Sequence, residues 1–148
     1  MRAKNRKYDD TGKVFGISAV ITIIVLSFVG VILVRSVSKP SYTFSGNELT
    51  ISGQYHVMID LSDAGISHAF SRIPSPELRT NGASIGGIKK GYYRIDGEKA
   101  YMNIMDATAE NYILITDQNN DRYYINCRTT EETDALYDEI MSQIGSEK

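Results

Sequence analysis

The chain is poor in residues that form covalent crosslinks and metal centres. Its 148 residues include a single cysteine, Cys127, so an intramolecular disulfide or a cysteine-based metal site is excluded. Only two histidines occur, His56 and His68, and neither has a second ligand at metal-binding spacing. We predict no metal and no other cofactor, and we interpret both histidines as partly exposed strand residues.

The chain also lacks a strong charge excess and the short motifs of enzyme active sites. The formal net charge is −2, which gives no reason to expect nucleic acid as a partner. No Gly-x-Ser-x-Gly nucleophile motif occurs. The glycines of residues 82–91 suggest a phosphate loop, but a strand-like segment follows them where such a loop needs a helix. We therefore predict a protein without catalytic residues that is not an enzyme.

Residues 117–121 (DQNND) begin like a calcium-binding loop. Such a loop needs glycine at its sixth position and glutamate at its twelfth, and this chain has Arg122 and Arg128 there. We predict a polar hairpin tip instead.

One long apolar run is present, at residues 14–34 (VFGISAVITIIVLSFVGVILV). As a helix rising about 1.5 Å per residue, it is long enough to cross a hydrocarbon core of about 30 Å. A buried core helix is disfavoured by this uninterrupted apolarity. A cleaved signal peptide has a shorter apolar region, of about 7–15 residues, and an A-x-A-like site. We predict an uncleaved single-pass anchor in the lipid bilayer of the cell membrane.

The residues that flank this run predict its orientation. Five basic residues precede it within residues 1–13, and only Arg35 and Lys39 follow closely. Because lysine and arginine favour the cytoplasmic side, we predict a cytoplasmic N-terminus and an extracytoplasmic domain. Binding of this basic tail to anionic lipid is the alternative interpretation. Residues 14–34 contain no GxxxG motif, so they leave the oligomeric state unknown.

The remainder of the chain predicts a short linker and one domain. Residues 35–40 include Pro40 and form the linker, and residues 41–148 suffice for a single core. Segments rich in β-branched and aromatic residues predict strands. Residues 62–76 are either a helical turn or a strand near 66–73. Asp96-Gly97 predicts a hairpin turn. The strands are expected at residues 42–44, 48–51, 54–61, 78–81, 91–95, 99–105, 112–116 and 122–126, with a loop between 81 and 91.

The last element is an amphipathic helix at residues 130–144. Thr129 and Glu132 match a capping box, and an apolar stripe follows. About seven or eight strands and one closing helix predict a mainly β (α+β) fold, either a small barrel or a two-sheet sandwich. The residues of the stripe are Leu136, Tyr137, Ile140, Met141 and Ile144.

The central part of the domain resembles the bacterial pleckstrin-homology (PH) domain family. The resemblance lies in Leu78-Arg79-Thr80-Asn81-Gly82, in Gly86-Gly87 and in Gly91-Tyr92-Tyr93-Arg94, followed by the later strands and the closing helix. It is most specific over residues 78–126. Where the family often has Pro-Gly-Tyr, this chain has Gly86-Gly87-Ile88. The resemblance implies a PH-like barrel of about seven antiparallel strands capped by a helix, and it implies no single activity.

Lys89, Lys90 and Arg94 form the one basic cluster that is a candidate ligand site. A solvated strand end is the alternative interpretation, and an anionic lipid headgroup or envelope polymer is the ligand that would suit the cluster. We predict a non-enzymatic protein-binding or assembly module whose partners are membrane or envelope proteins. The alternatives are a sensor of anionic lipids or polymers and an enzyme accessory subunit.

Overall fold

The computed structural model describes residues 6–145, with side chains from Val14 onward. Residues 1–5 and 146–148 lie outside the described residues, so the predicted basic tail is seen only as backbone from Arg6. The chain separates into two units, the first ending at Arg35 and the second beginning at Ser36. Each is described by itself.

Helix α1 (Arg6–Val37) contains the apolar run. Its candidate membrane span is Val14–Val37, and the 18-residue apolar window that defines the span contains no residue buried inside the protein. An apolar helix of this length without protein cover matches a membrane span or a signal sequence. The helix also includes residues 35–37, which were expected in the linker.

The second unit contains nine strands and one helix among the described residues. A three-stranded antiparallel sheet has the order β1-β2-β3, and a six-stranded sheet has the order β4-β8-β9-β7-β6-β5. The mainly β class is confirmed. The strands are β1 (Ser41–Ser45), β2 (Glu48–Ser52), β3 (Val57–Asp60), β4 (Gly65–Ala69), β5 (Leu78–Ile85), β6 (Ile88–Ile95), β7 (Glu98–Ile104), β8 (Tyr112–Thr116) and β9 (Arg122–Asn126).

The predicted closed barrel is wrong, because the two sheets remain separate and each keeps two edge strands. The prediction of purely antiparallel strands is wrong as well, since β7 and β9 pair in parallel. The physical reason is the connection from β7 to β8, which crosses to the far side of β9 before the β8–β9 hairpin returns beside β7. Strand order of this kind depends on tertiary packing and leaves no local sequence pattern.

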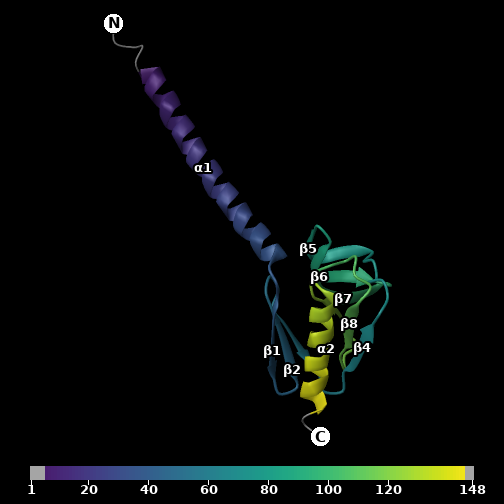
Figure 1. The fold of residues 1–148 in the computed structure, drawn as a ribbon. Coiled ribbons are helices and arrows are strands. Elements are labelled where there is room, and N and C mark those ends of the chain that lie inside the picture. The colour runs from purple at the N-terminus through teal and green to yellow at the C-terminus, as the bar shows by residue number, and fades with distance from the viewer. Residues whose placement is uncertain (1–5, 146–148) are drawn as a thin grey trace. The chain divides into compact units, whose positions relative to one another are not determined.

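Helix α2 (Thr130–Gly145) confirms the predicted closing helix. Its side chains Leu136 and Ile140 are buried in one core with residues from both sheets, so the helix covers the space between the two sheets (Figure 1). Met141 was expected in the same stripe but is 42% exposed. The core residues from the sheets include Leu49, Ile51, Ile113, Ile115 and Ile125.

Strands β5 and β6 form a continuous hairpin where a loop was expected. Ile85 pairs with Ile88 across Gly86 and Gly87, both of which have positive φ. A β-carbon on Gly91 would lie 2.3 Å from the backbone oxygen of Asn81. The glycines therefore allow two backbones to approach closely and to turn tightly, and they do not mark a loop.

Candidate functional site

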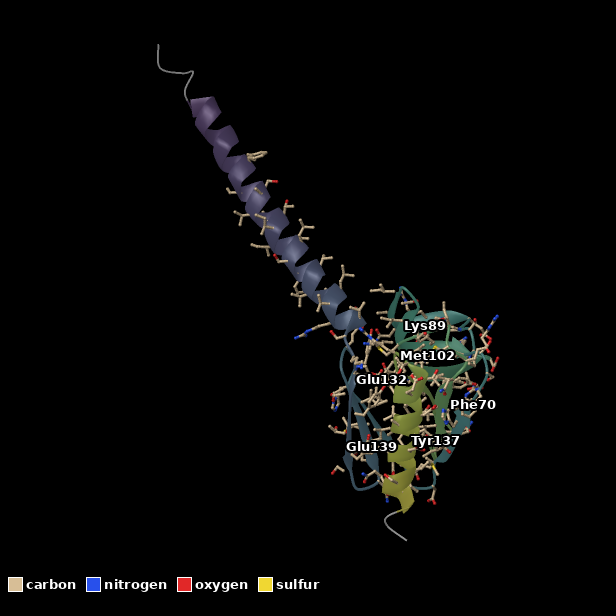
Figure 2. All side chains as sticks on the ribbon, in the orientation of Figure 1. Phe70, Lys89, Met102, Glu132, Tyr137 and Glu139 are labelled. Atoms are coloured by element: carbon tan, nitrogen blue, oxygen red, sulfur yellow. The ribbon has the colours of Figure 1, made fainter. Side chains whose placement is uncertain are left out.

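A cavity of about 310 Å³ opens between the start of β1 and the part of α2 from Glu132 to Glu139. Its interior is mainly apolar, and charged side chains of both signs surround it. Figure 2 labels Glu132 and Glu139, which lie on the side of α2 nearer β1. The lining residues are Lys39, Pro40, Tyr42, Met105, Cys127, Arg128, Glu132, Ala135, Leu136 and Glu139.

The segment that leads into this cavity is fixed to the domain by three cationic side chains. Lys90 Nζ donates a hydrogen bond to the carbonyl of Ser38, and Arg128 donates to the carbonyl of Val37 over 3.0 Å. Lys39 forms an ion pair with Glu132. The last carbonyls of a helix have no partner within the helix, so the first two contacts satisfy groups that would otherwise need water.

Glu132 lies in the first turn of α2, where the helix dipole favours a negative charge. The N–H of Glu132 donates to Thr129 Oγ1 over 3.2 Å, which confirms Thr129 as the N-cap. The Lys39 ammonium group, aided by the nearby backbone N–H groups of Arg128 and Thr129, lowers the pKa of the Glu132 carboxyl. Its Oε1 binds Lys39, while Oε2 forms no hydrogen bond with any described residue. This oxygen is buried, so it is a polar atom without a hydrogen-bond partner among the described residues.

Cys127 and Tyr42 lie side by side in the lining. Burial raises the pKa of the Cys127 thiol and raises the pKa of Tyr42 well above its ordinary value near 10. The thiol is therefore protonated at neutral pH, whereas a nucleophilic cysteine is a thiolate. Tyr42 accepts a hydrogen bond from Asn103 Nδ2 at 3.2 Å. This part of the cavity is suited to binding and not to nucleophilic chemistry.

The outer edge of β1 is unpaired, because β1 is the first strand of the order β1-β2-β3. The N–H of Leu61 donates to the carbonyl of Asn47. In an antiparallel sheet the backbone groups of successive residues point alternately to the two neighbouring strands, so odd-numbered residues of β2 bond to β3 and even-numbered residues bond to β1. By that alternation, the backbone groups of Thr43 and Ser45 pair with β2, whereas those of Tyr42 and Phe44 point outward. The exposed edge therefore offers four backbone groups, two N–H and two C=O, beside the cavity.

The three predicted ligand residues lie on one strand, β6, but do not form one site. Lys90 is 3% exposed and already binds Ser38, and burial followed by the nearby Arg128 lowers its pKa. Because successive strand residues point to opposite faces, Lys89 lies on the other face of the sheet. Arg94 is four residues beyond Lys90, about 13 Å along the strand. Their role in binding an anion stays a prediction.

His68 belongs to a polar cluster on the other side of α2. Its Nε2 lies 2.6 Å from Asn111 Oδ1 and 3.2 Å from Asp134 Oδ1. Its ring packs against Phe70 and Tyr137, which Figure 2 shows on that side of the helix. The cluster connects the edge strand β4 to α2. These contacts account for the packing of β4 against α2, and they do not indicate a catalytic role for His68.

Two other predicted features have local structural roles. His56 Nδ1 lies 3.3 Å from Ser52 Oγ. Asp117 Oδ1 accepts hydrogen bonds from the N–H groups of Asn119 and Asp121, so residues 117–121 form the expected hairpin tip. No group of three potential metal ligands occurs within the described part of the chain.

No protein-family model matches the chain, and no curated protein and no solved structure matches it either. The resemblance drawn from residues 78–126 therefore stays a prediction.

Proposed function

We propose that this chain is a single-pass membrane protein whose domain binds an extended segment of a partner protein. The span Val14–Val37 supports the anchor by its length and apolarity. The flanking basic residues support a cytoplasmic N-terminus and an extracytoplasmic domain. The anchor confines the domain to one surface and so raises its effective concentration for partners in the same membrane.

The proposal of peptide binding is based on the unpaired edge of β1, which lies beside the cavity. An extended peptide can add a strand to such an edge, with backbone hydrogen bonds supplying affinity. Side chains of the added strand that face α2, as Tyr42 and Phe44 do, enter the cavity. Its volume is near the lower end of the range for ligand pockets, roughly 300–1,000 Å³, so it suits one or two apolar side chains.

Hydrogen exchange at β1 tests this proposal most sharply. We would select peptides from a random display library against the full-length protein in nanodiscs, and then measure amide exchange with a selected peptide bound. The amides of Tyr42 and Phe44 point outward, so we expect their exchange to slow at least tenfold. The amides of Thr43 and Ser45 already pair with β2 and should change little. Binding without protection at Tyr42 and Phe44 would contradict strand addition.

A matched pair of variants separates the cavity from the rest of the helix. Ala135 is exposed and lines the cavity, so Ala135→Trp should fill it and weaken peptide binding at least tenfold. Asp138 is exposed on the same helix and does not line the cavity, so Asp138→Trp should bind like the original protein. Equal affinities for both variants would show that the cavity is not used.

The alternative function is a sensor of anionic lipid headgroups or envelope polymers through Lys89, Lys90 and Arg94. The separation of these three side chains favours peptide binding over this alternative. An enzyme accessory role has less support, because the lining offers no activated nucleophile. We retain membership of the bacterial PH domain family as a proposal, supported by the central strands and the closing helix. The parallel β7–β9 pair departs from the fold which that family implies.

A further inference from the structure

The turn between β5 and β6 combines one exposed and one half-buried isoleucine, Ile85 and Ile88, with a lysine. Gly86 and Gly87 make the turn, and Ile85 and Ile88 flank it as a cross-strand pair. Ile85 is 37% exposed, and Lys89 follows directly. No acidic residue occurs anywhere in residues 78–95. This combination suits a membrane interface, where an apolar side chain enters the acyl region and a lysine reaches the headgroups.

Chain connectivity brings this turn close to the end of the membrane span. Lys90 binds the carbonyl of Ser38, and Ser38 directly follows Val37, the last residue of the candidate span. Along β6 the turn begins two residues from Lys90, a distance of about 7 Å. The headgroup layer of one leaflet is roughly 5–8 Å thick. The turn is therefore within reach of that layer on whichever side the domain lies.

The opposite end of the domain carries acidic turns. Strand β6 runs away from the 85–88 turn and ends at Asp96-Gly97, where β7 begins its return. Strand β9 is parallel to β7, so the turn that precedes β9 also lies at this far end. Acidic residues lie at the near end as well, since Asp106 adjoins Ala107, whose N–H donates to the carbonyl of Gly87 over 3.0 Å. The proposed orientation therefore rests on the contact of Lys90 with Ser38 and on the residues of the turn itself, and not on a charge difference between the two ends. The acidic residues of the far turns include Asp96, Glu98, Asp117 and Asp121.

We propose that residues 85–89 contact the bilayer that α1 crosses, with Ile85 and Ile88 among the outer acyl carbons and Lys89 at the phosphate groups. This inference rests on the proposed membrane anchor and is independent of peptide binding at β1. The contact restricts rotation of the domain about its short connection. It also holds the β1 edge in a fixed orientation for partners in the same membrane.

Depth-dependent fluorescence quenching tests the contact in the full-length protein. In a Cys127→Ser background, single cysteines replace Ser84 beside the turn, Asn119 at the far end, or Ser27 in the span, and each carries a polarity-sensitive fluorophore. The protein is reconstituted into vesicles of phosphatidylcholine and phosphatidylglycerol that contain nitroxide-labelled lipid. We expect quenching at positions 84 and 27 to exceed quenching at position 119 several-fold.

Two variants of the same hairpin provide a matched comparison. Ile85→Asp should reduce quenching at position 84 to the level at position 119, because a carboxylate disfavours insertion. Leu78 is 56% exposed at the far end of β5, so Leu78→Asp should leave quenching at position 84 unchanged. Equal reductions by both variants would attribute the effect to altered folding and overturn the inference.

The outcomes also distinguish this inference from the anchor on which it rests. Quenching at position 27 with equal, weak quenching at positions 84 and 119 would overturn the lipid contact and leave the anchor in place. Weak quenching at all three positions would overturn both. Peptide binding at β1 is measured by hydrogen exchange and does not depend on either result.

Discussion

The ammonium group of Lys90 donates a hydrogen bond to the backbone carbonyl of Ser38, although 52 positions of sequence separate them. This contact, with that of Arg128 to Val37, holds residues 37 and 38 against the rest of the domain. Residues 36–40 are therefore a segment that packs on the domain and not a flexible linker.

The Lys90 contact can be removed without changing the size of the side chain greatly. Lys90→Met should raise the amide exchange rates of residues 36–42 at least tenfold, because Ser38 loses a charged donor. Lys89→Met is the control, since Lys89 has no hydrogen bond or ion pair to any described residue. Equal exchange in the two variants would show that the contact does not hold this segment.

Asn126 stabilises the connection between β7 and β8. Its Oδ1 accepts hydrogen bonds from the N–H groups of Met105 and Asp106, and its Nδ2 donates to the carbonyl of Asp106. Asn126→Ala leaves two backbone donors without this partner, so we expect the free energy of unfolding to fall by about 2–4 kcal/mol. Asn119→Ala, in an exposed turn, should change it by less than about 0.5 kcal/mol. Urea unfolding in detergent checks both values.

The close approach of β5 and β6 predicts different costs for two glycine substitutions. A β-carbon on Gly91 meets the backbone of Asn81 at 2.3 Å, whereas one on Gly97 meets open space, and both residues have positive φ. Gly97→Ala therefore measures the backbone strain alone, about 1–2 kcal/mol. Gly91→Ala should cost at least about 2 kcal/mol more, because backbone must move. Similar melting temperatures for the two variants would contradict the close approach.

Buried tyrosines predict a loss of stability at alkaline pH. Burial raises the pKa of Tyr101 and of Tyr123, so the folded state retains phenolic protons that the unfolded state releases near pH 10. The free energy of unfolding should stay constant below this pH and decline above it, by up to about 1.4 kcal/mol per pH unit for each tyrosine. Tyr123→Phe should make the decline shallower. Urea unfolding at a series of pH values measures the slope, and a flat profile above pH 10 would contradict the assignment.

Local sequence patterns predicted the local parts of this structure. The Thr129 cap and the apolar spacing of Leu136 and Ile140 located α2, and Asp96-Gly97 located a hairpin turn, because each depends on neighbouring residues. The β5–β6 hairpin was missed because its glycines were interpreted as a loop. Because the segment was interpreted as a loop, the alternation of side chains along a strand was not applied to it, and this alternation is what places Lys89 and Lys90 on opposite faces of the sheet.

The cavity could not be predicted, because its residues come from separated segments. Lys39 and Glu132 are 93 positions apart, and neither shows a pattern that indicates the other. Tyr42 and Cys127 meet only because α2 closes the space between two sheets. The free edge of β1 was likewise hidden, since strand order depends on pairing between distant segments.

The membrane anchor underlies both the proposed function and the proposed lipid contact, and a single labelling measurement tests it. A chain with Cys127→Ser and Asn119→Cys is expressed in cells, treated with a membrane-impermeant maleimide before lysis, and recovered after carbonate extraction. We predict a full-length, labelled chain in the membrane fraction. A soluble chain shortened by the apolar segment would contradict the anchor, and labelling only after lysis would contradict the predicted orientation.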